Sequence, residues 1–233
     1  MSKSVLKEIK KNETGYGFLI ENDGYITLND ERNKTLKESF GNIDGEWHCP
    51  NPFIVNAVFQ KSDTKNANGR IYPDSILKRE VERYQEKIKE HRALGELNHP
   101  ADSTIDLGRI SHNIIELHWE GKTVVGKLEL NLTPGYVKYG ICSSLGDSTA
   151  NLLLNGYKIG VSSRAVGSVE SKLGVMMVGN DLELICWDIV SDPSTPGAWI
   201  GDEETLQQYV ESDETLNNKT SILEKVNKIK EIL

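Results

Sequence analysis

Three short segments carry residue types suited to nucleophilic catalysis. LGELNHPADS supplies His99, GVSSRAVG supplies Ser162, and LELICWDIVSDPSTPGAW supplies Asp188. A serine, a histidine and a carboxylate can act together as nucleophile, general base and orienting acid, as they do in serine hydrolases. Such triads are recognised by their geometry, so the chain order His, Ser, Asp neither supports nor excludes this interpretation.

The neighbours of His99 and Ser162 set their local geometry. Pro100 disfavours helical backbone at His99, which predicts a loop or a strand end there; the alternative is an ordinary surface or core histidine. In an extended segment Ser162 shares a face with Gly160, where the missing side chain leaves room for a substrate backbone. The alternative is a solvent-facing strand with a bulge at the glycines.

Two residues after Ser162 are candidates for binding the negative charge of a reaction intermediate. Ser163 and Arg164 follow the serine directly and are candidate turn and anion-stabilising groups. An esterase would place its serine in a G-x-S-x-G elbow. Arg164 stands where the second glycine of that elbow belongs, which argues against an esterase.

The environment of Asp188 follows from a period-two pattern. Leu182, Leu184, Cys186 and Asp188 alternate along the chain, which predicts an apolar strand face that leads onto a partly buried carboxylate. Such a carboxylate needs a partner, either a histidine N–H, as in a triad, or a nearby Lys or Arg. Asp192 is the rival carboxylate, but its SDPS context is typical of a turn in which Asp caps its own backbone.

The surrounding sequence predicts the elements that position these residues. FIVNAVFQ (53–60) is typical of a strand, and 110–130 of two strands joined at Glu120-Gly121. A helix is predicted from Asp74, as N-cap, to His91, because the apolar residues Leu77, Val81, Tyr84 and Ile88 follow helical spacing. A second, less regular helix is predicted around 139–155. Several strands with few helices predict an α+β domain built on a sheet or barrel.

The two ends of the chain differ from its centre. We predict an N-terminal extension with weak structure over residues 1–50, in which only YITL (25–28) resembles a strand, and a principal domain over 51–200. Residues 201–233 are predicted to be an acidic linker followed by a C-terminal amphipathic helix, since Ile222, Val226, Ile229 and Leu233 follow helical spacing. A helix this short is marginal alone, so it needs a partner surface or is a tail that can be lost.

Composition excludes several function classes. The 233-residue chain has a formal net charge of −8, which argues against nucleic acid as its main partner. It has no apolar run of about 18 residues, so no membrane span is expected, and its N-terminus is not typical of a secretory signal. Three separated cysteines fit a reducing compartment. Without a CxxC pair or a His/Cys cluster, neither a metal nor a cofactor is expected.

Five pieces of sequence, taken together, resemble the prohead maturation proteases of tailed bacteriophages. NGRIYP, ALGELNHP, WEGKTVVGKLEL, GVSSRAVGS and WDIVSDPSTPGAW occur in the order of that family and span about residues 53–200. The resemblance implies a serine endopeptidase with the fold of herpesvirus assemblins, a small β-barrel surrounded by helices. It implies His99 as catalytic histidine and Ser162 as nucleophile. Asp188 is the third member by spacing, and His112 is an outside candidate because assemblins use a second histidine.

The same resemblance implies a biological setting. It places the oxyanion-binding backbone near Ser163 and Arg164, and the enzyme inside the viral prohead in the host cytoplasm. The implied substrates are scaffold or core proteins, the major capsid protein and the protease itself, cut after an aliphatic-x-Glu motif. Such triplets occur near both ends of this chain as Leu6-Lys7-Glu8, Ile222-Leu223-Glu224 and Ile229-Lys230-Glu231, so the resemblance makes the N-terminal extension and the C-terminal helix candidate propeptides. Assemblins dimerise to become active, so a homodimer is the candidate oligomer. The alternative is a catalytically silent assembly or scaffold-binding protein with the same fold.

Overall fold

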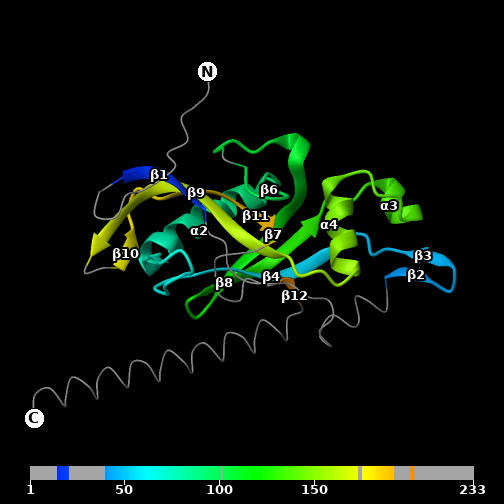
Figure 1. Ribbon diagram of the computed structural model, residues 1–233, viewed down its shortest axis with the longest axis horizontal. Helices are drawn as coiled ribbons and strands as arrows, with labels where there is room; N and C mark the ends of the chain where they lie inside the picture. Colours follow the sequence, from blue (N-terminus) through cyan, green and yellow to red (C-terminus); the bar gives the residue numbers. More distant parts are fainter. Residues whose placement is uncertain (1–14, 21–39, 101, 173–174, 192–199, 202–233) are drawn as a thin grey trace, which may run out of the picture.

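The computed structural model describes residues 15–20, 40–100, 102–172, 175–191 and 200–201 (Figure 1). One five-stranded sheet contains β1 (Gly15–Ile20), β5 (Arg70–Ile71), β9 (Gly160–Lys172), β10 (Val175–Val178) and β11 (Glu183–Val190). A second contains β4 (Ile54–Lys61), β6 (Leu94–Glu96), β7 (Ile110–Glu120), β8 (Thr123–Leu130) and β12 (Ile200–Gly201). β2 (Gly41–Ile43) and β3 (Glu46–His48) form a separate hairpin. The helices of the described part are α2 (Asp74–Lys89), α3 (Pro134–Tyr139) and α4 (Leu145–Leu154).

The long strand β9 organises the first sheet and crosses much of the molecule (Figure 1). One edge of β9 pairs with β1 over Arg164–Val169. The other edge pairs first with β11 over Gly160–Val166 and then with β10. All of these pairings are antiparallel; the first residues of β9, Gly160–Ser163, pair with β11 alone, and Arg164–Val166 lie between β11 and β1.

The second sheet has the strand order β12-β4-β8-β7-β6 and approaches the first sheet at its β6 edge. A parallel bridge joins Leu97, just after β6, to Ile189 of β11. The predicted strand over 53–60 and the hairpin with its turn at Glu120-Gly121 are confirmed as β4, β7 and β8. Valine and isoleucine recur in these strands, as expected for residues whose branched side chains fit a pleated, buried surface.

The predicted helix from Asp74 to His91 is confirmed as α2, which ends two residues earlier at Lys89. Its apolar stripe faces inward: Leu77, Val81 and Tyr84 are buried. Asp74 is the first helical residue rather than the N-cap, because Pro73 occupies the cap position without a side-chain hydrogen bond. The Asp74 carboxylate instead accepts a hydrogen bond from the Ser62 hydroxyl at 2.8 Å.

The less regular helix predicted around 139–155 is confirmed as α4 (Leu145–Leu154), which starts six residues later, and the short helix α3 before it was not predicted. Gly140 ends α3 in the left-handed conformation, with φ of 70°, which glycine adopts without steric cost. Ser144 then starts α4 through a capping box with Asp147. These two terminal signals explain why the second helix begins at Leu145 and not near Tyr139.

The expected weak structure of the N-terminal region is wrong for part of it. Gly15–Ile20 form β1, and Leu19 is fully buried against the main core. Phe40 is also buried and packs against Phe53 and Trp47. Single strands such as β1 gain their stability from a neighbouring strand, so their own sequence gives little signal. YITL, the C-terminal helix and the three aliphatic-x-Glu triplets lie outside the described residues.

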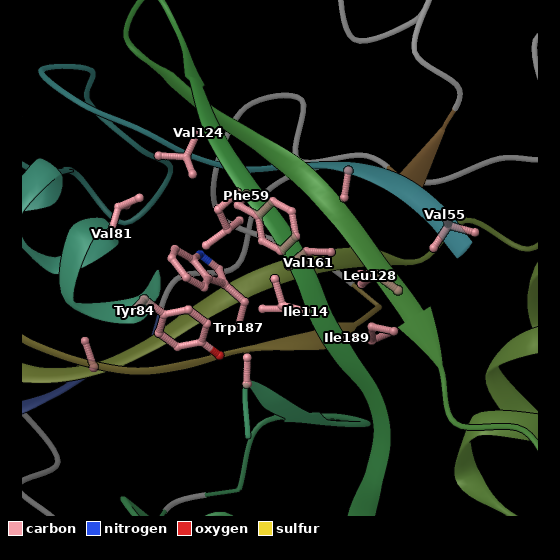
Figure 2. Close-up of a cluster of buried hydrophobic side chains, with 14 of the residues drawn as sticks. Val55, Phe59, Val81, Tyr84, Ile114, Val124, Leu128, Val161, Trp187 and Ile189 are labelled. Atoms are coloured by element: carbon pink, nitrogen blue, oxygen red, sulfur yellow. The ribbon is translucent and has the colours of Figure 1, made fainter. Parts of the chain in front are cut away.

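The core lies between the two sheets and α2. Trp187 is its largest fully buried side chain and makes edge-to-face contacts with Phe59 and Tyr84, at centroid distances of 5.4 and 4.9 Å (Figure 2). Ile114 and Ile189 surround this aromatic group in the same cluster (Figure 2). Because Trp187 directly precedes Asp188, its packing fixes the strand that carries the carboxylate.

The predicted α+β class is confirmed, with two sheets and a few helices at their sides. The likeness to herpesvirus assemblins stays a prediction. Within the described residues, no helix is both long enough and apolar enough to span a membrane.

Candidate active site

His99, Ser162 and Asp188 form one hydrogen-bonded group in the structure. The Ser162 Oγ atom lies 2.7 Å from His99 Nε2, and His99 Nδ1 lies 2.7 Å from Asp188 Oδ2. Ser162 and Asp188 are direct cross-strand partners in the β9–β11 ladder. The histidine comes from the segment after β6, so three parts of the chain meet here. A nucleophile, a base and an orienting carboxylate require this geometry.

A β-bulge in β11 turns Asp188 toward Ser162. Leu184 pairs with Ala165, whereas Cys186, two residues on, pairs with Arg164. Adjacent residues of a strand point to opposite faces, so Leu184 and Cys186 lie on opposite faces of the sheet. The predicted single apolar face from Leu182 to Asp188 is therefore wrong, because the extra residue in the bulge shifts the alternation. Cys186 and Asp188 share the face of Ser162 and Arg164.

The backbone before His99 explains how the ring reaches the serine. Asn98 has a φ of 66°, in the left-handed region that Asn tolerates better than most residues. Its N–H donates to the Ile189 carbonyl at 2.8 Å, which attaches the loop to β11 one residue past Asp188. The prediction that His99 lies outside a helix, at a strand end, is confirmed, and its side chain is only 8% exposed.

Asp188 is fully buried and still favours its ionised form. Burial alone would raise the pKa of this carboxyl group. The hydrogen bond from His99 and the positive charge of Arg164 outweigh burial, so the pKa lies below the ordinary value of 3.8. Both partners that the sequence left open, a histidine and an arginine, are present. The carboxylate therefore stays negative at neutral pH and can hold the imidazole in one orientation.

Arg164 and Ser163 lie on different sides of β9. The Arg164 guanidinium is on the Ser162 face and is fully buried, with Nε 2.9 Å from Asp188 Oδ2 and Nη2 2.9 Å from Glu96 Oε1. Ser163 points the other way, pairs with Trp187, and has no hydrogen-bond partner for its hydroxyl among the described residues. The structure thus brings Arg164 to the triad and leaves the Ser163 side chain outside it. An oxyanion role for these residues stays a prediction about their backbone N–H groups.

Glu96 belongs to this site but was missed in the sequence. It lies three residues before His99, is fully buried, and donates its backbone N–H to Asp188 Oδ1 at 3.0 Å. Its carboxylate binds Arg164 and also Arg109, at 3.1 Å. A charged residue at the end of a short apolar segment was the available signal, since a buried carboxylate needs partners.

His112, the outside candidate for the triad, is not placed in it. It is fully buried on β7, where Nδ1 lies 2.9 Å from Ser111 Oγ and Nε2 lies 3.2 Å from the Trp187 carbonyl. Burial lowers the pKa of His112 to about 4, so the ring is neutral at physiological pH. These contacts describe a core histidine.

Several alternatives left open by the sequence can now be judged. Ser162 is 2% exposed, so the alternative of a solvent-facing strand is wrong. Asp192 lies outside the described residues. Among the residues that the structure describes, no group of three or more His, Cys, Asp or Glu side chains is placed to hold a metal ion.

The known proteins to which this chain is similar are phage proteases of prohead or capsid assembly. The chain matches the model of the prohead core protein serine protease family over residues 19–211. The prohead core protein protease of Enterobacteria phage T4 is 32% identical over 166 residues, which cover 68% of this chain and 73% of that protein. The structure of the bacteriophage T4 capsid assembly protease matches with a TM-score of 0.56 and 23% identity, over 78% of this chain and 100% of that one. The chain therefore belongs to the prohead core protein serine protease family.

Proposed function

We propose that this protein is the serine endopeptidase of phage prohead maturation. The observation that carries the proposal is the continuous hydrogen-bonded path from Ser162 Oγ through the His99 ring to Asp188, with 2.7 Å at each step. Family membership supplies the reaction class, since the related phage T4 protein is named as a prohead core protease.

In this mechanism Ser162 Oγ attacks the carbonyl carbon of a peptide bond while His99 Nε2 accepts its proton. The same proton then passes from His99 to the leaving amine, and the acyl-enzyme is hydrolysed by water in the reverse sequence of steps. Asp188 Oδ2 accepts the Nδ1–H of His99, which fixes the tautomer and stabilises the imidazolium. Backbone N–H groups near Ser163 and Arg164 are the proposed oxyanion donors, a role typically worth about 10²–10³ in rate.

The proposed substrates are the scaffold or core proteins and the major capsid protein of the prohead, together with the enzyme itself. Cleavage is proposed after an aliphatic-x-Glu motif inside the prohead, in the host cytoplasm. The triplets near the ends of the chain, after Glu8, Glu224 and Glu231, are the proposed self-processing sites. A homodimer is the candidate active oligomer.

Mass spectrometry of the purified protein over time tests this function. Wild-type protein is expected to lose terminal segments after Glu, whereas Ser162→Ala stays full-length. A peptide with aliphatic-x-Glu-Ala is expected to be cut after Glu by the wild type alone. If neither protein trims itself and the peptide stays intact, the catalytically silent assembly protein becomes the better description. Equal trimming of both proteins would exclude Ser162 as the nucleophile.

A further inference from the structure

A buried ion network lies beside the triad and contacts Asp188. Arg164 is one of the largest fully buried side chains of the molecule, and a buried guanidinium is costly unless its charge and its N–H groups are matched. Its Nη1 donates to the Asp102 carbonyl at 2.8 Å, and its Nη2 lies within 3.2 Å of Glu96, Cys186 and Asp188. The two terminal nitrogens thus connect the triad carboxylate to its surroundings, whereas Nε is near Asp188 without making a hydrogen bond among the described residues.

Both oxygens of Asp188 contact this network. Oδ1 accepts from the Glu96 N–H at 3.0 Å and from Arg164 Nη2 at 3.2 Å, with the Cys186 thiol at 3.3 Å. Oδ2, the oxygen that faces His99, also lies 2.9 Å from Arg164 Nε. A carboxylate with two oxygens fixed by one planar group cannot rotate about its last bond without losing both contacts.

Glu96 fixes the guanidinium in turn. Its Oε1 accepts from Arg164 Nη2 at 2.9 Å and from the Asp106 N–H at 3.0 Å, and its Oε2 lies 3.1 Å from Arg109 Nε. The two carboxylates, Glu96 and Asp188, are fully buried together with one buried arginine, Arg164. Arg109, at 40% side-chain exposure, supplies the second positive charge from the surface.

We propose that Arg164 and Glu96 are positioning residues of this active site: Arg164 fixes the carboxylate of Asp188, and Glu96 fixes Arg164. The inference rests on the proposed function and deepens it. It assigns the Arg164 side chain to the orienting acid instead of the oxyanion. It also attaches the loop that follows His99, through Asp102 and Asp106, to the same pair.

A positioning role and a purely structural role differ in their effect on the pH dependence of the rate at which Ser162 reacts. Charged and titratable groups face Arg164 and Asp188 from every neighbouring element: Glu96 on β6, His99 after it, Arg109 at the 3₁₀ turn (Leu107–Arg109), His112 on β7, Tyr84 on α2 and Cys186 on β11. Removal of the Glu96 charge disfavours the imidazolium of His99. Removal of the Arg109 charge favours it.

The experiment measures the rate at which a fluorophosphonate labels Ser162 between pH 5 and 9 in the full-length protein. Glu96→Gln is expected to slow labelling about tenfold and to move the midpoint of the pH profile to lower pH. Arg164→Lys keeps the charge but loses the fork, and is expected to slow labelling roughly 10²-fold. Arg109→Met, a change at the surface, keeps the proposal testable if the buried variants do not fold, and is expected to move the midpoint to higher pH.

Asp147→Asn is the matched control, because Asp147 is another fully buried carboxylate with several hydrogen bonds but lies on α4, away from the triad. It is expected to lower stability and leave the pH midpoint unchanged. Unchanged midpoints in Glu96→Gln and Arg109→Met, or losses that follow only the folded fraction as in Asp147→Asn, would overturn the inference while the proposed function stands. If Ser162 of the wild type is not labelled, the proposed function fails and the inference fails with it.

Discussion

Ser162 and Asp188 are direct partners across the β9–β11 ladder, and their side chains lie on the same face of the sheet. The backbone pairing of two strands thus sets the separation of the proposed nucleophile and acid, and His99 lies between them on a third segment, 2.7 Å from each. A slip of one residue in this ladder would move one of them to the other face. The strand register therefore fixes two of the three residues, and the loop that carries His99 supplies the third.

The two adjacent serines are predicted to behave oppositely. Ser162→Ala removes the nucleophile and is expected to reduce kcat roughly 10⁶-fold. Ser163→Ala is expected to leave activity nearly unchanged, because that side chain lies on the Trp187 side of the sheet. Its buried hydroxyl has no partner among the described residues, so its removal should change the free energy of unfolding by less than about 1 kcal/mol. Peptide hydrolysis and urea unfolding of both variants check this; a large loss in Ser163→Ala would contradict it.

Asp188→Asn is predicted to reduce kcat about 10⁴-fold with a smaller effect on KM. The amide cannot accept the Nδ1–H of His99 with a full negative charge, so the imidazole loses its tautomer preference. Arg164 also loses one of its two carboxylate partners, Glu96 being the other, so the variant should unfold at lower urea concentration. Steady-state kinetics and urea unfolding measure the two effects. In a Ser162→Ala background the same change should cost no further activity, and a further loss would show that Asp188 acts elsewhere.

The buried histidine His112 predicts a pH dependence of stability. Burial lowers its pKa to about 4, whereas the unfolded chain titrates near 6.5, so between these values the unfolded state binds more protons. The free energy of unfolding should therefore fall as the pH is lowered from 6.5 to 4, by about 3 kcal/mol from this residue. Urea unfolding at pH 7 and pH 4.5 measures the difference.

His112→Asn is expected to be less stable at pH 7 but to show a flatter dependence on pH. His118→Asn is the control, because His118 is half-exposed and lies beside Glu116 and Glu120 on the surface. If His112→Asn keeps the full pH dependence of the wild type, the assignment of the effect to His112 is wrong.

Helix α2 contacts the bulge of β11, so we predict that Lys87 affects both the stability and the activity of the protein. Lys87 Nζ donates to the Ile185 carbonyl at 2.7 Å, inside the bulge, and Glu80 accepts from the Leu184 N–H at 3.0 Å. Lys87→Met is expected to cost about 1–3 kcal/mol of stability, as for a hydrogen bond to a charged group. It should also lower activity, since the bulge sets the face of Asp188.

Lys89→Met is the matched control for this prediction, because Lys89 lies two residues further along the last turn of α2 and is exposed. Urea unfolding and peptide hydrolysis of both variants measure the effects. Equal effects in the two variants would show that helix charge, and not the bulge contact, is responsible.

The sequence predicts correctly those elements whose pattern lies within one segment of the chain, and it does not predict contacts between distant segments. α2, β4, β7 and β8 follow from periodicity and turn residues that lie within each segment. His99, Ser162 and Asp188 could be selected by residue type and by resemblance, but their meeting depends on the β9–β11 register and on the turn at Asn98. The side of the sheet on which Asp188 lies, relative to Leu182 and Leu184, could not be predicted. The bulge adds one residue to the strand, and no local sequence pattern indicates it.

The missed features are all non-local. The role of Glu96 depends on its contact with Arg164, which lies 68 positions further along the chain. Strand β1 forms because it pairs with β9, and the sequence of neither segment alone predicts this pairing. Propensities describe a residue in its own segment, and tertiary contacts decide these cases.

The pairing of β1 with β9 has a consequence for the solubility of trimmed forms. β1 covers the backbone N–H and C=O groups of β9 from Arg164 to Val169, the residues that follow the nucleophile. A chain shortened past Ile20 would present this row of groups unpaired, and an unpaired strand edge is a template for self-association. Trimming that stops before Gly15 would leave the edge protected, so the position of the first cut separates a stable enzyme from an aggregation-prone one.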